Sequence, residues 1–444
     1  MSNTTSVAGA TGLSATHPPR ARASSSVRVA MAAMVGTAIE AFDFLIYGTA
    51  AALVFNQLFF PTFDPVTGTL AAFGAFASGL IARPIGGLLF GHFGDRIGRK
   101  AMLTLSLLLM GICTVLIGLL PTYASIGVWA TVLLVVLRIA QGLSFGGELG
   151  GAMLMAVEHA PAKSRGFFGS LPQAGAPIGL LMATAAFSMV NLLPNESFLN
   201  WGWRLPFLAS ALLIVVGLYI RYTVGESPEF EAVKNKRKTS TLPAAEVLKR
   251  HWRPLLMTIG GKLGEVTLFY TIVVFSISYA TMSLGFSRGD ALNAVLIGSA
   301  IQLFSIPFFG WIADKVGARR IYVFGSVLLA VMAPFLFKAI GSGSVVAYTV
   351  AVVIALSLNY AIIFGPQSSL YSVQFPIELR YSGMSIGIQL AAAMGGGMAP
   401  LIATGLVSAY GDIQPVGFYI AALGLIGAVS AWFMRGDVHP AHTE

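Results

Sequence analysis

The stretch GHFGDRIGRK at 91–100 returns in altered form as GWIADKVGARR at 310–320, 219 residues further along the chain. Each copy lies between two long apolar runs and places glycines, an aspartate and basic residues in the same order. The copies differ where Ala318 stands in the position of Arg99. A basic hinge that is used twice at matching places predicts a chain built from two similar halves.

The composition indicates that these halves lie in a lipid bilayer. Of the 444 residues, 56% are hydrophobic and 10% are charged, whereas soluble domains have roughly 25% charged residues. A mean hydropathy of +0.79 leaves more apolar surface than a water-soluble core could bury. The single cysteine, Cys113, rules out a disulfide within the chain, and we expect no cleavable signal peptide.

Apolar runs of about 20 residues, which is the length that crosses a bilayer, divide the chain into spans. We predict twelve spans: 29–58, 70–92, 101–120, 128–158, 166–193, 204–222, 254–283, 291–313, 321–339, 345–374, 382–410 and 416–434. They form an N-terminal six-helix bundle (28–222) and a C-terminal one (254–435). A disordered tail (1–27), a polar linker (223–253) and a second tail (436–444) complete the chain.

The basic residues orient these spans. Most of the 27 lysines and arginines fall in the tails, the linker and the loops on one side of the predicted membrane. The positive-inside rule assigns that side to the cytoplasm, so both termini are predicted to be cytoplasmic. Topology therefore accounts for the net charge of +9, and no nucleic-acid partner is predicted.

Three polar side chains share one face of the first predicted span. Glu40, Asp43 and Tyr47 are separated by three and four residues, which is the spacing of one helical face. An ionisable group inside a span costs about 2.5–3.5 kcal/mol on insertion scales, so it is retained where it has a partner, water or a function. We predict that Asp43, far from either end of the span, carries the proton.

The fourth predicted span holds a second such set. Arg138, Gln141 and Glu148 lie on one face of that helix. An arginine that pairs with Asp43 would hold it ionised, and an anionic substrate that engages Arg138 would leave Asp43 free to take a proton. We predict that Asp43, Glu40, Glu148 and Arg138 couple proton to substrate, with Glu148 the second candidate carrier.

Two further charged sites allow more than one interpretation. Lys262 and Glu265, one turn apart in the seventh span, either bind substrate or only neutralise each other. Arg83, near the cytoplasmic end of the second span, either contacts substrate or extends to the interface. The positive charge favours a small carboxylate. The predicted substrate-binding residues are Arg138, Gln141, Lys262, Glu265, Tyr47, Gln173, Tyr270, Asn359, Gln389 and Arg83.

The hinge copies and several other runs resemble one known group of proteins. The hinge resembles the loop motif of the major facilitator superfamily, and five further runs are similar to its metabolite:proton symporter family. They are GTAIEAFDFLIYG (36–48), RPIGG (83–87), RIAQGLSFGGELGGA (138–152), WGWRLPF (201–207) and FPIELRYSG (375–383). The resemblance implies a major facilitator fold, with twelve transmembrane helices in two pseudo-symmetric six-helix bundles. Members of the family import shikimate, 2-oxoglutarate, citrate, proline or betaine with protons, and the pattern is most similar to shikimate-type transporters.

The resemblance also implies roles for individual residues. The hinges latch the cytoplasmic face while the cavity opens outward, which gives a gating set of Gly94, Asp95, Arg96, Gly98, Arg99, Lys100, Asp314 and Arg380. Asp43 and Arg138 match a coupling pair in related proton-linked sugar carriers. Ala41 and Leu149 depart from the aromatic residues that are usual at their positions, which puts transfer of any one member's substrate in doubt.

These observations predict an inner-membrane secondary transporter that imports a small organic acid by proton symport through alternating access, acting as a monomer without cofactor or metal. A proton-coupled exporter and a symporter of a zwitterion such as proline or betaine are the alternatives. An enzyme is not predicted, because the chain lacks the GxxxxGK[ST], HExxH and GxSxG motifs and any metal-spaced set of cysteines and histidines.

Overall fold

The computed structural model describes residues 19–97, 99–146, 149–158, 160–223, 243–376 and 379–436. Within these ranges the chain is helical and has no β-strand, which confirms the all-α prediction. Eleven helical stretches are long and apolar enough to cross a membrane, and α4 (Arg99–Leu119) adds a further apolar helix. The structure therefore agrees with the twelve predicted spans.

The first half contains six of these spans. It begins with α1 (Pro19–Ala50), which continues through the π-helical turn η1 (Ala51–Phe55) into α2 (Asn56–Phe59). The remaining elements are α3 (Pro65–Ile97), α4, α5 (Tyr123–Ile126), α6 (Val128–Phe145), α7 (Leu149–Glu158), η2 (Ala162–Ser164), α8 (Arg165–Val190), α9 (Asn195–Asn200), η3 (Gly202–Arg204) and α10 (Leu205–Thr223).

The second half contains the other six spans. After the short α12 (Pro243–Arg250), α13 (Trp252–Tyr270) continues through η4 (Thr271–Phe275) into α14 (Ser276–Met282). The remaining elements are α15 (Arg288–Val316), α16 (Ala318–Ile340), α17 (Val345–Ile354), η5 (Ala355–Tyr360), α18 (Ala361–Phe364), α19 (Gln367–Ser372), α20 (Arg380–Ala391), η7 (Ala392–Gly397), α21 (Ala399–Tyr410) and α22 (Gln414–Trp432).

The ends of the two halves differ in part from the predicted limits. Helix α1 begins at Pro19, so residues 19–27 are helical and the prediction of a disordered tail is wrong for them. The alanines and arginines of this stretch are good helix formers and extend the first span by more than two turns. Helix α12 lies in the predicted linker, of which residues 224–242 are outside the described part of the chain.

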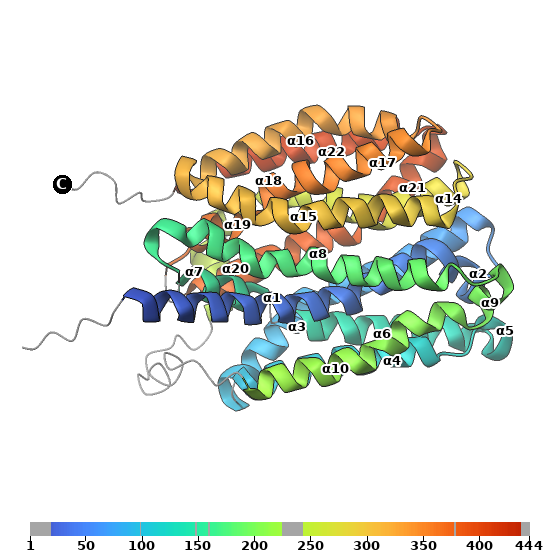
Figure 1. Cartoon of the computed structure of the whole chain (residues 1–444), viewed down its shortest axis with the longest axis horizontal. Coiled ribbons are helices and arrows are strands. Elements are labelled where there is room, and N and C mark those ends of the chain that lie inside the picture. The colour runs from blue at the N-terminus through green and yellow to red at the C-terminus, as the bar shows by residue number, and fades with distance from the viewer. Residues whose placement is uncertain are drawn as a thin grey trace, which may run out of the picture.

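The two halves meet along two pairs of helical elements. Helix α8 of the first half packs along α15 of the second, and α3 packs against α20, η7 and α21 (Figure 1). The two contacts are equivalent under exchange of the halves, as a repeated architecture requires. We call the end of the bundle at which α1 begins and α22 ends the terminal face, and the opposite end the far face.

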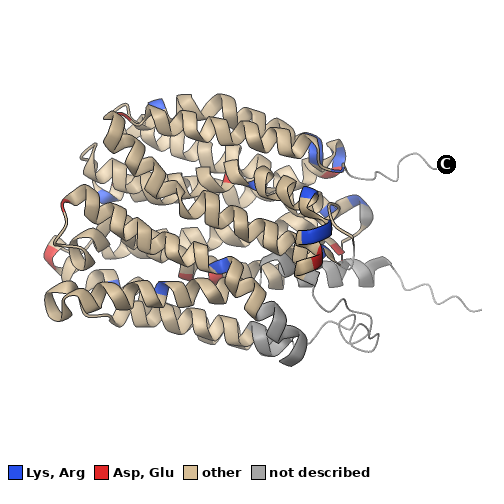
Figure 2. Cartoon of the chain, turned by 180° about the vertical axis from the view of Figure 1, so that it is seen from behind, with Lys and Arg blue, Asp and Glu red and all other residues tan. Residues whose placement is uncertain are grey.

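The outer surface of the helices is apolar. Phe304, Phe335 and Leu212 are 74%, 69% and 68% exposed among the residues that the structure describes. Charged residues lie mostly near the ends of the described helices and are sparse between them, as the colours in Figure 2 show. Exposed aromatic and leucine side chains of this kind are stable against lipid, so the belt marks the part of the molecule that lies in a bilayer.

Candidate functional site

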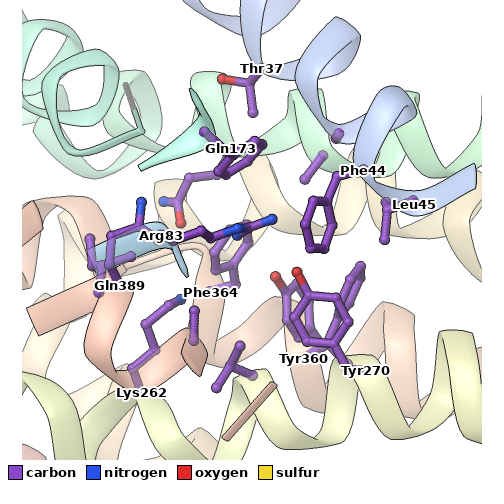
Figure 3. Close-up of a pocket in the computed structure, with 17 residues that line it drawn as sticks. Thr37, Phe44, Leu45, Arg83, Gln173, Lys262, Tyr270, Tyr360, Phe364 and Gln389 are labelled. Carbon is purple, nitrogen blue, oxygen red and sulfur yellow. The ribbon is translucent and has the colours of Figure 1, made fainter. Parts of the chain in front are cut away.

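A cavity lies between the two halves, near the middle of the spans (Figure 3). Both halves line it, with Thr37, Ala41, Phe44, Leu45, Arg83, Phe145, Gln173 and Ala176 from the first and Lys262, Val266, Phe269, Tyr270, Tyr360, Phe364, Ile388, Gln389 and Ala392 from the second. All of these except Ala176 are buried. The side chains that line the cavity are therefore largely shielded from water.

Arg83 supplies a positive charge to the cavity. It comes from α3, is 4% exposed, and its guanidinium lies 3.8 Å from the ring centroid of Phe44 and 3.7 Å from that of Phe145. Its Nε has no hydrogen-bond partner. Figure 3 shows the side chain extending into the cavity, so of the two interpretations of Arg83 the structure supports the cavity and not the membrane interface.

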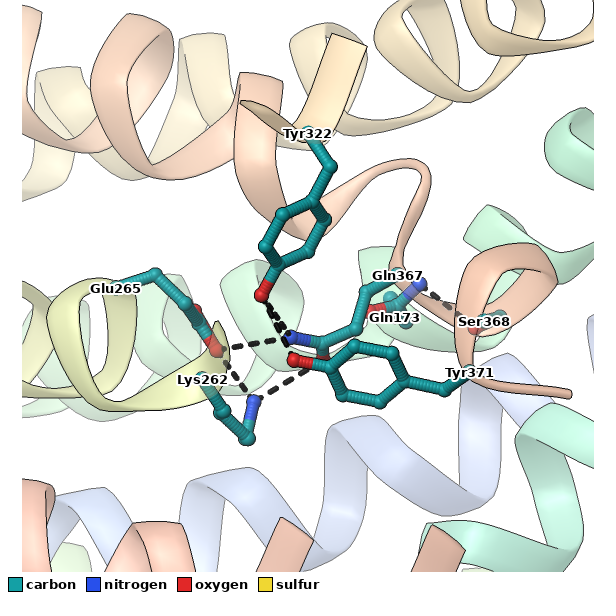
Figure 4. A network of polar contacts seen from close by, with 7 residues as sticks. All are labelled: Gln173, Lys262, Glu265, Tyr322, Gln367, Ser368 and Tyr371. Carbon is teal, nitrogen blue, oxygen red and sulfur yellow. Dashed lines mark hydrogen bonds and ion pairs between the residues drawn. The ribbon is translucent and has the colours of Figure 1, made fainter. Parts of the chain in front are cut away.

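Lys262 supplies the second positive charge and already has a carboxylate partner. Its ammonium forms an ion pair with Glu265, one turn further along α13, and donates to Gln367 Oε1 at 3.0 Å. Gln367 Nε2 donates in turn to Glu265 Oε1 at 3.2 Å (Figure 4). The hydroxyls of Tyr322 and Tyr371, 2.8 Å apart, continue this network behind the cavity wall.

Two glutamines at equivalent places join the halves beside the cavity. Gln173 on α8 donates to Ser368 Oγ at 2.8 Å, and Gln389 on α20 donates to the carbonyl oxygen of Gly146 at 3.3 Å. The carbonyl oxygens of both glutamine side chains have no hydrogen-bond partner. Because both side chains line the cavity, these oxygens are available to a donor on a bound molecule.

The predicted pair of Asp43 and Arg138 is not formed in this structure. The carboxyl of Asp43 accepts a hydrogen bond of 2.5 Å from Ser210 on α10. Arg138 donates instead to Gln141 at 2.6 Å, and Gln141 donates to the backbone oxygen of Asp43 at 3.0 Å and to Thr114 at 2.7 Å. The sequence placed both groups in the interior, but their side chains point to different neighbours.

Arg138 also lies behind the cavity wall and not in it. Its guanidinium is 3.8 Å from the ring centroid of Phe44 and 4.2 Å from that of Tyr47. The residue is 0% exposed, and its Nε and Nη2 have no hydrogen-bond partner. The ring of Phe44 lines the cavity where Arg138 does not, so a ligand reaches this guanidinium only if Phe44 moves.

The structure therefore divides the predicted substrate-binding residues into two groups. Arg83, Gln173, Lys262, Tyr270 and Gln389 line the cavity. Five others are buried outside its lining, and their role in binding stays a prediction: Arg138, Gln141, Tyr47, Asn359 and Glu265. Spacing along a helix identified buried polar residues correctly but did not identify the layer in which each lies.

The remaining proton-coupling predictions have different outcomes. Glu40 is 3% exposed on α1, and its charge acts on Asp43 and Arg83. Glu148 lies outside the described residues. Ser210, Thr114 and Gln367 are partners that sequence reasoning missed, because a serine, threonine or glutamine inside an apolar run is common and usually bonds its own helix.

At the terminal face, the second hinge copy closes the gap between the halves. Asp314, near the end of α15, accepts hydrogen bonds from the backbone N–H groups of Gly166 and Phe167 at 2.6 and 2.8 Å. These groups lie in the first turn of α8, where a helix favours a negative charge. Arg380 forms an ion pair of 3.7 Å with Glu158 at the same face. The predictions for the first copy are not tested, because Gly98, the surroundings of Gly94 and the side chains of Asp95, Arg96, Arg99 and Lys100 lie outside the described part of the structure.

The far face is also closed by a contact between halves. Arg288, at the start of α15, donates to Asn195 Oδ1 at 2.9 Å, and its guanidinium lies 4.5 Å from the ring centroid of Phe198. Asp314 at one face and Arg288 at the other therefore hold the two halves together at both ends of the bundle.

Comparison with known proteins identifies a family and several relatives. The sequence model described as Major Facilitator Superfamily matches residues 33–387 of the chain. The chain is 43% identical over 402 residues to the Escherichia coli protein named inner membrane metabolite transport protein YhjE, covering 89% of this chain and 91% of that protein.

Two relatives have more specific names. The Escherichia coli shikimate transporter is 39% identical over 412 residues, covering 92% of this chain and 94% of the relative. The Salmonella typhimurium proline/betaine transporter is 31% identical over 414 residues, covering 91% of this chain and 82% of the relative.

Solved structures of a xylose transporter share the fold. The proton:xylose symporter XylE bound to 6-bromo-6-deoxy-D-glucose has a TM-score of 0.71 at 20% identity, covering 94% of this chain and 97% of that one. A partially occluded inward open conformation of XylE from Escherichia coli has a TM-score of 0.70 at 20% identity, covering 94% and 99%. At this identity the likeness concerns the fold alone.

Proposed function

The chain belongs to the major facilitator superfamily, whose members are membrane transporters and not enzymes, and from this premise we propose that it imports a small organic anion together with protons. The anion would bind in the cavity between the halves. Opening of the far face and of the terminal face in turn would expose that cavity to each side of the membrane.

The buried guanidinium of Arg83 is the main support for an anionic substrate. It is buried in the cavity wall, its charge faces aromatic rings, and one of its donors is unsatisfied. A buried donor without a partner costs about 1–3 kcal/mol, more for a charged group, and a substrate carboxylate would remove that cost. The free oxygens of Gln173 and Gln389 suit hydroxyl groups on the same molecule. A hydroxylated acid, as in the name of the shikimate transporter, fits this set.

A zwitterion fits the same cavity less well. It would need a carboxylate for its ammonium group, and Glu265 is held by Lys262 and Gln367 outside the cavity lining. We therefore place the anion first, although one relative is named for proline and betaine.

Asp43 is the proposed proton carrier. It is 1% exposed, and its hydrogen-bond partner is the neutral hydroxyl of Ser210 and not a cation. Among the described residues it has no ion pair, and a carboxyl group inside a span is retained where it has a function. Gln141 bonds both to Arg138 and to the backbone oxygen of Asp43. A movement of Arg138 toward a substrate would therefore disturb the hydrogen bonds around Asp43.

Orientation follows from the basic residues. We propose that the terminal face is cytoplasmic, because most lysines and arginines of the sequence fall on that side. The membrane would be the inner membrane of a bacterium, in line with the name of the YhjE relative. Asp314 and Arg380 would then form the cytoplasmic gate.

Uptake by purified protein in proteoliposomes tests the proposal. Radiolabelled shikimate, 2-oxoglutarate, citrate and proline would be supplied outside, with and without an inward proton gradient. We expect gradient-dependent accumulation of one of the three acids. Accumulation of proline alone would support the zwitterion, and gradient-driven expulsion of a preloaded compound would support an exporter.

Replacement of Asp43 tests the proton step. We expect Asp43→Asn to abolish accumulation against a gradient while exchange of labelled for unlabelled substrate continues, because exchange requires no net proton movement. Gradient-driven accumulation that survives in this variant would assign the proton to another group.

A further inference from the structure

Lys262 is the cavity cation whose partner belongs to the protein itself. Lys262 is 4% and Glu265 1% exposed, and their ion pair lies within one turn of α13. Gln367 bonds to both members, so the three groups form a closed triangle (Figure 4). The second oxygen of Glu265, Oε2, has no hydrogen-bond partner.

The ion pair matters when the carrier closes around its cavity, because Lys262 is then removed from water. A buried ammonium without a counter-charge is strongly unfavourable, so Lys262 needs an anion whenever both faces are closed. In the empty carrier Glu265 meets that need. A substrate carboxylate that binds Lys262 would compete with Glu265 for the same ammonium.

This inference rests on the proposed function. We propose that Glu265 is an internal substitute for the substrate carboxylate: it binds Lys262 in the empty carrier, releases it when the anion binds, and then takes up a proton. The proton would come from water on the side to which the cavity is open, form an O–H bond on Glu265, and leave to water on the other side when the substrate departs. No other bond is made or broken.

The surroundings of Glu265 suit both of its states. While Lys262 is bound, the carboxylate accepts hydrogen bonds from Lys262 and Gln367. Once Lys262 turns to the substrate, Gln367 Oε1 loses its ammonium donor and becomes an acceptor for the O–H of protonated Glu265. The glutamine therefore satisfies either form, which an apolar neighbour could not.

No other charged group competes for Glu265 among the described residues around it. The titratable groups that its charge reaches are Tyr322 of α16, Tyr360 of η5 and Tyr371 of α19, together with Lys262. Helix α22 and η7, which pack on α13, carry no Asp, Glu, Lys or Arg, and the one such residue of α20, Arg380, is bonded to Glu158. Helix α16 carries Arg319 and Arg320, which donate to the backbone oxygens of Met434 and Val316, and Lys338, in its last turn. The charged residues of α12 lie beside the beginning of α13, more than three turns before Glu265.

The test compares net uptake with exchange in proteoliposomes that hold the full chain. Net uptake requires the empty carrier to return, whereas exchange of labelled for unlabelled substrate does not. The probe is whichever of shikimate, 2-oxoglutarate, citrate and proline the wild-type protein accumulates. We expect Glu265→Gln to lower the ratio of net uptake to exchange at least about 10-fold, because the empty carrier would have to close on an unpaired Lys262.

A double variant and a control variant test whether the effect of E265Q arises from an unpaired Lys262. In K262Q/E265Q no charge needs a partner, so we expect the ratio to return to within about threefold of wild type while KM rises at least about 10-fold for loss of the ammonium. Glu246→Gln removes a glutamate whose partner, Arg250, lies on the same exposed helix, and should leave the ratio unchanged.

Three results would overturn the inference. They are a wild-type ratio in E265Q, an equal loss of uptake and exchange in E265Q from a correctly folded protein, and an unchanged KM in the double variant. Should E265Q not fold, the double variant decides alone through its ratio and KM. A wild-type protein that accumulates none of the four compounds would instead contradict the proposed function, and the inference with it.

Discussion

The ring of Phe44 contacts two guanidinium groups, at 3.8 Å from Arg83 and 3.8 Å from Arg138. A cation held over an aromatic face gains about 0.5–1 kcal/mol at exposed sites and about 2 or more when desolvated. Both arginines are buried, at 4% and 0% exposure. Phe44 is thus part of what stabilises two positive charges near the middle of the spans.

Replacement of this ring should remove a stabilising contact from both arginines. We expect Phe44→Leu, which keeps a similar volume, to destabilise the protein by about 2–4 kcal/mol and to raise KM, measured by thermal unfolding and by uptake. Phe304→Leu makes the same chemical change at a side chain that is 74% exposed, and should alter neither quantity. An unchanged stability and KM in Phe44→Leu would show that the ring does not stabilise the two guanidinium groups.

Arg83 itself should determine the affinity for an anion. We expect Arg83→Gln to raise the Kd for the transported acid about 10-fold or more, because a charged hydrogen bond is worth about 1.5–3 kcal/mol. Equilibrium binding to the detergent-solubilised protein measures this without requiring transport. Arg320→Gln removes an exposed arginine at the end of the bundle and serves as the control. Unchanged binding in Arg83→Gln would move the substrate site away from this cavity.

At the scale of elements, the turn between α15 and α16 depends on a glycine. Gly317 has φ 104°, in the region that only glycine adopts without strain, and a methyl group there would meet no atom within 4 Å. We expect Gly317→Ala to destabilise the protein by about 1–2 kcal/mol through backbone strain alone. Gly405→Ala, in the interior of α21 with equally open surroundings, should instead be neutral or stabilising by up to about 1 kcal/mol. Thermal unfolding of the two variants checks the difference in sign.

The sequence predicted the helices better than it predicted the contacts between them. Twelve apolar runs and two hinges gave the spans and the halves, because length and hydropathy decide what crosses a bilayer. Helical spacing correctly placed Asp43, Arg138 and Lys262 in the interior. It could not show that Asp43 faces Ser210, since the face of one helix does not determine which neighbouring helix it meets. Nor could it show Gln367, whose contact with α13 spans about a hundred residues of chain.

At the scale of the whole molecule, the two faces are closed by different chemistry. Asp314 caps the start of α8 at the terminal face, and Arg288 bonds to Asn195 at the far face. Loss of either contact should favour opening at its own face. We expect Arg288→Gln to increase the population open at the far face about 5- to 30-fold, the range that corresponds to 1–2 kcal/mol.

Distances between spin labels would measure this population. Leu192 and Ser342 are exposed at the far face, one in each half, and can be replaced by cysteine. The only native cysteine, Cys113, is buried and should not react. Asp314→Asn is the matched control, since it should leave the Leu192–Ser342 distances short. An unchanged distance distribution in Arg288→Gln would show that this contact does not hold the far face.

The π-helical turns η1 (Ala51–Phe55) and η4 (Thr271–Phe275) begin 220 residues apart, at equivalent places in the first and seventh spans. Each turn accommodates one residue more than a regular α-helix would, and two unrelated insertions would have no reason to fall at the same step of both halves. The halves therefore share a backbone irregularity as well as a packing arrangement, as expected of a parallel repeat. At each turn the regular ladder of backbone hydrogen bonds is interrupted, so the first and seventh spans have matching points at which they can bend.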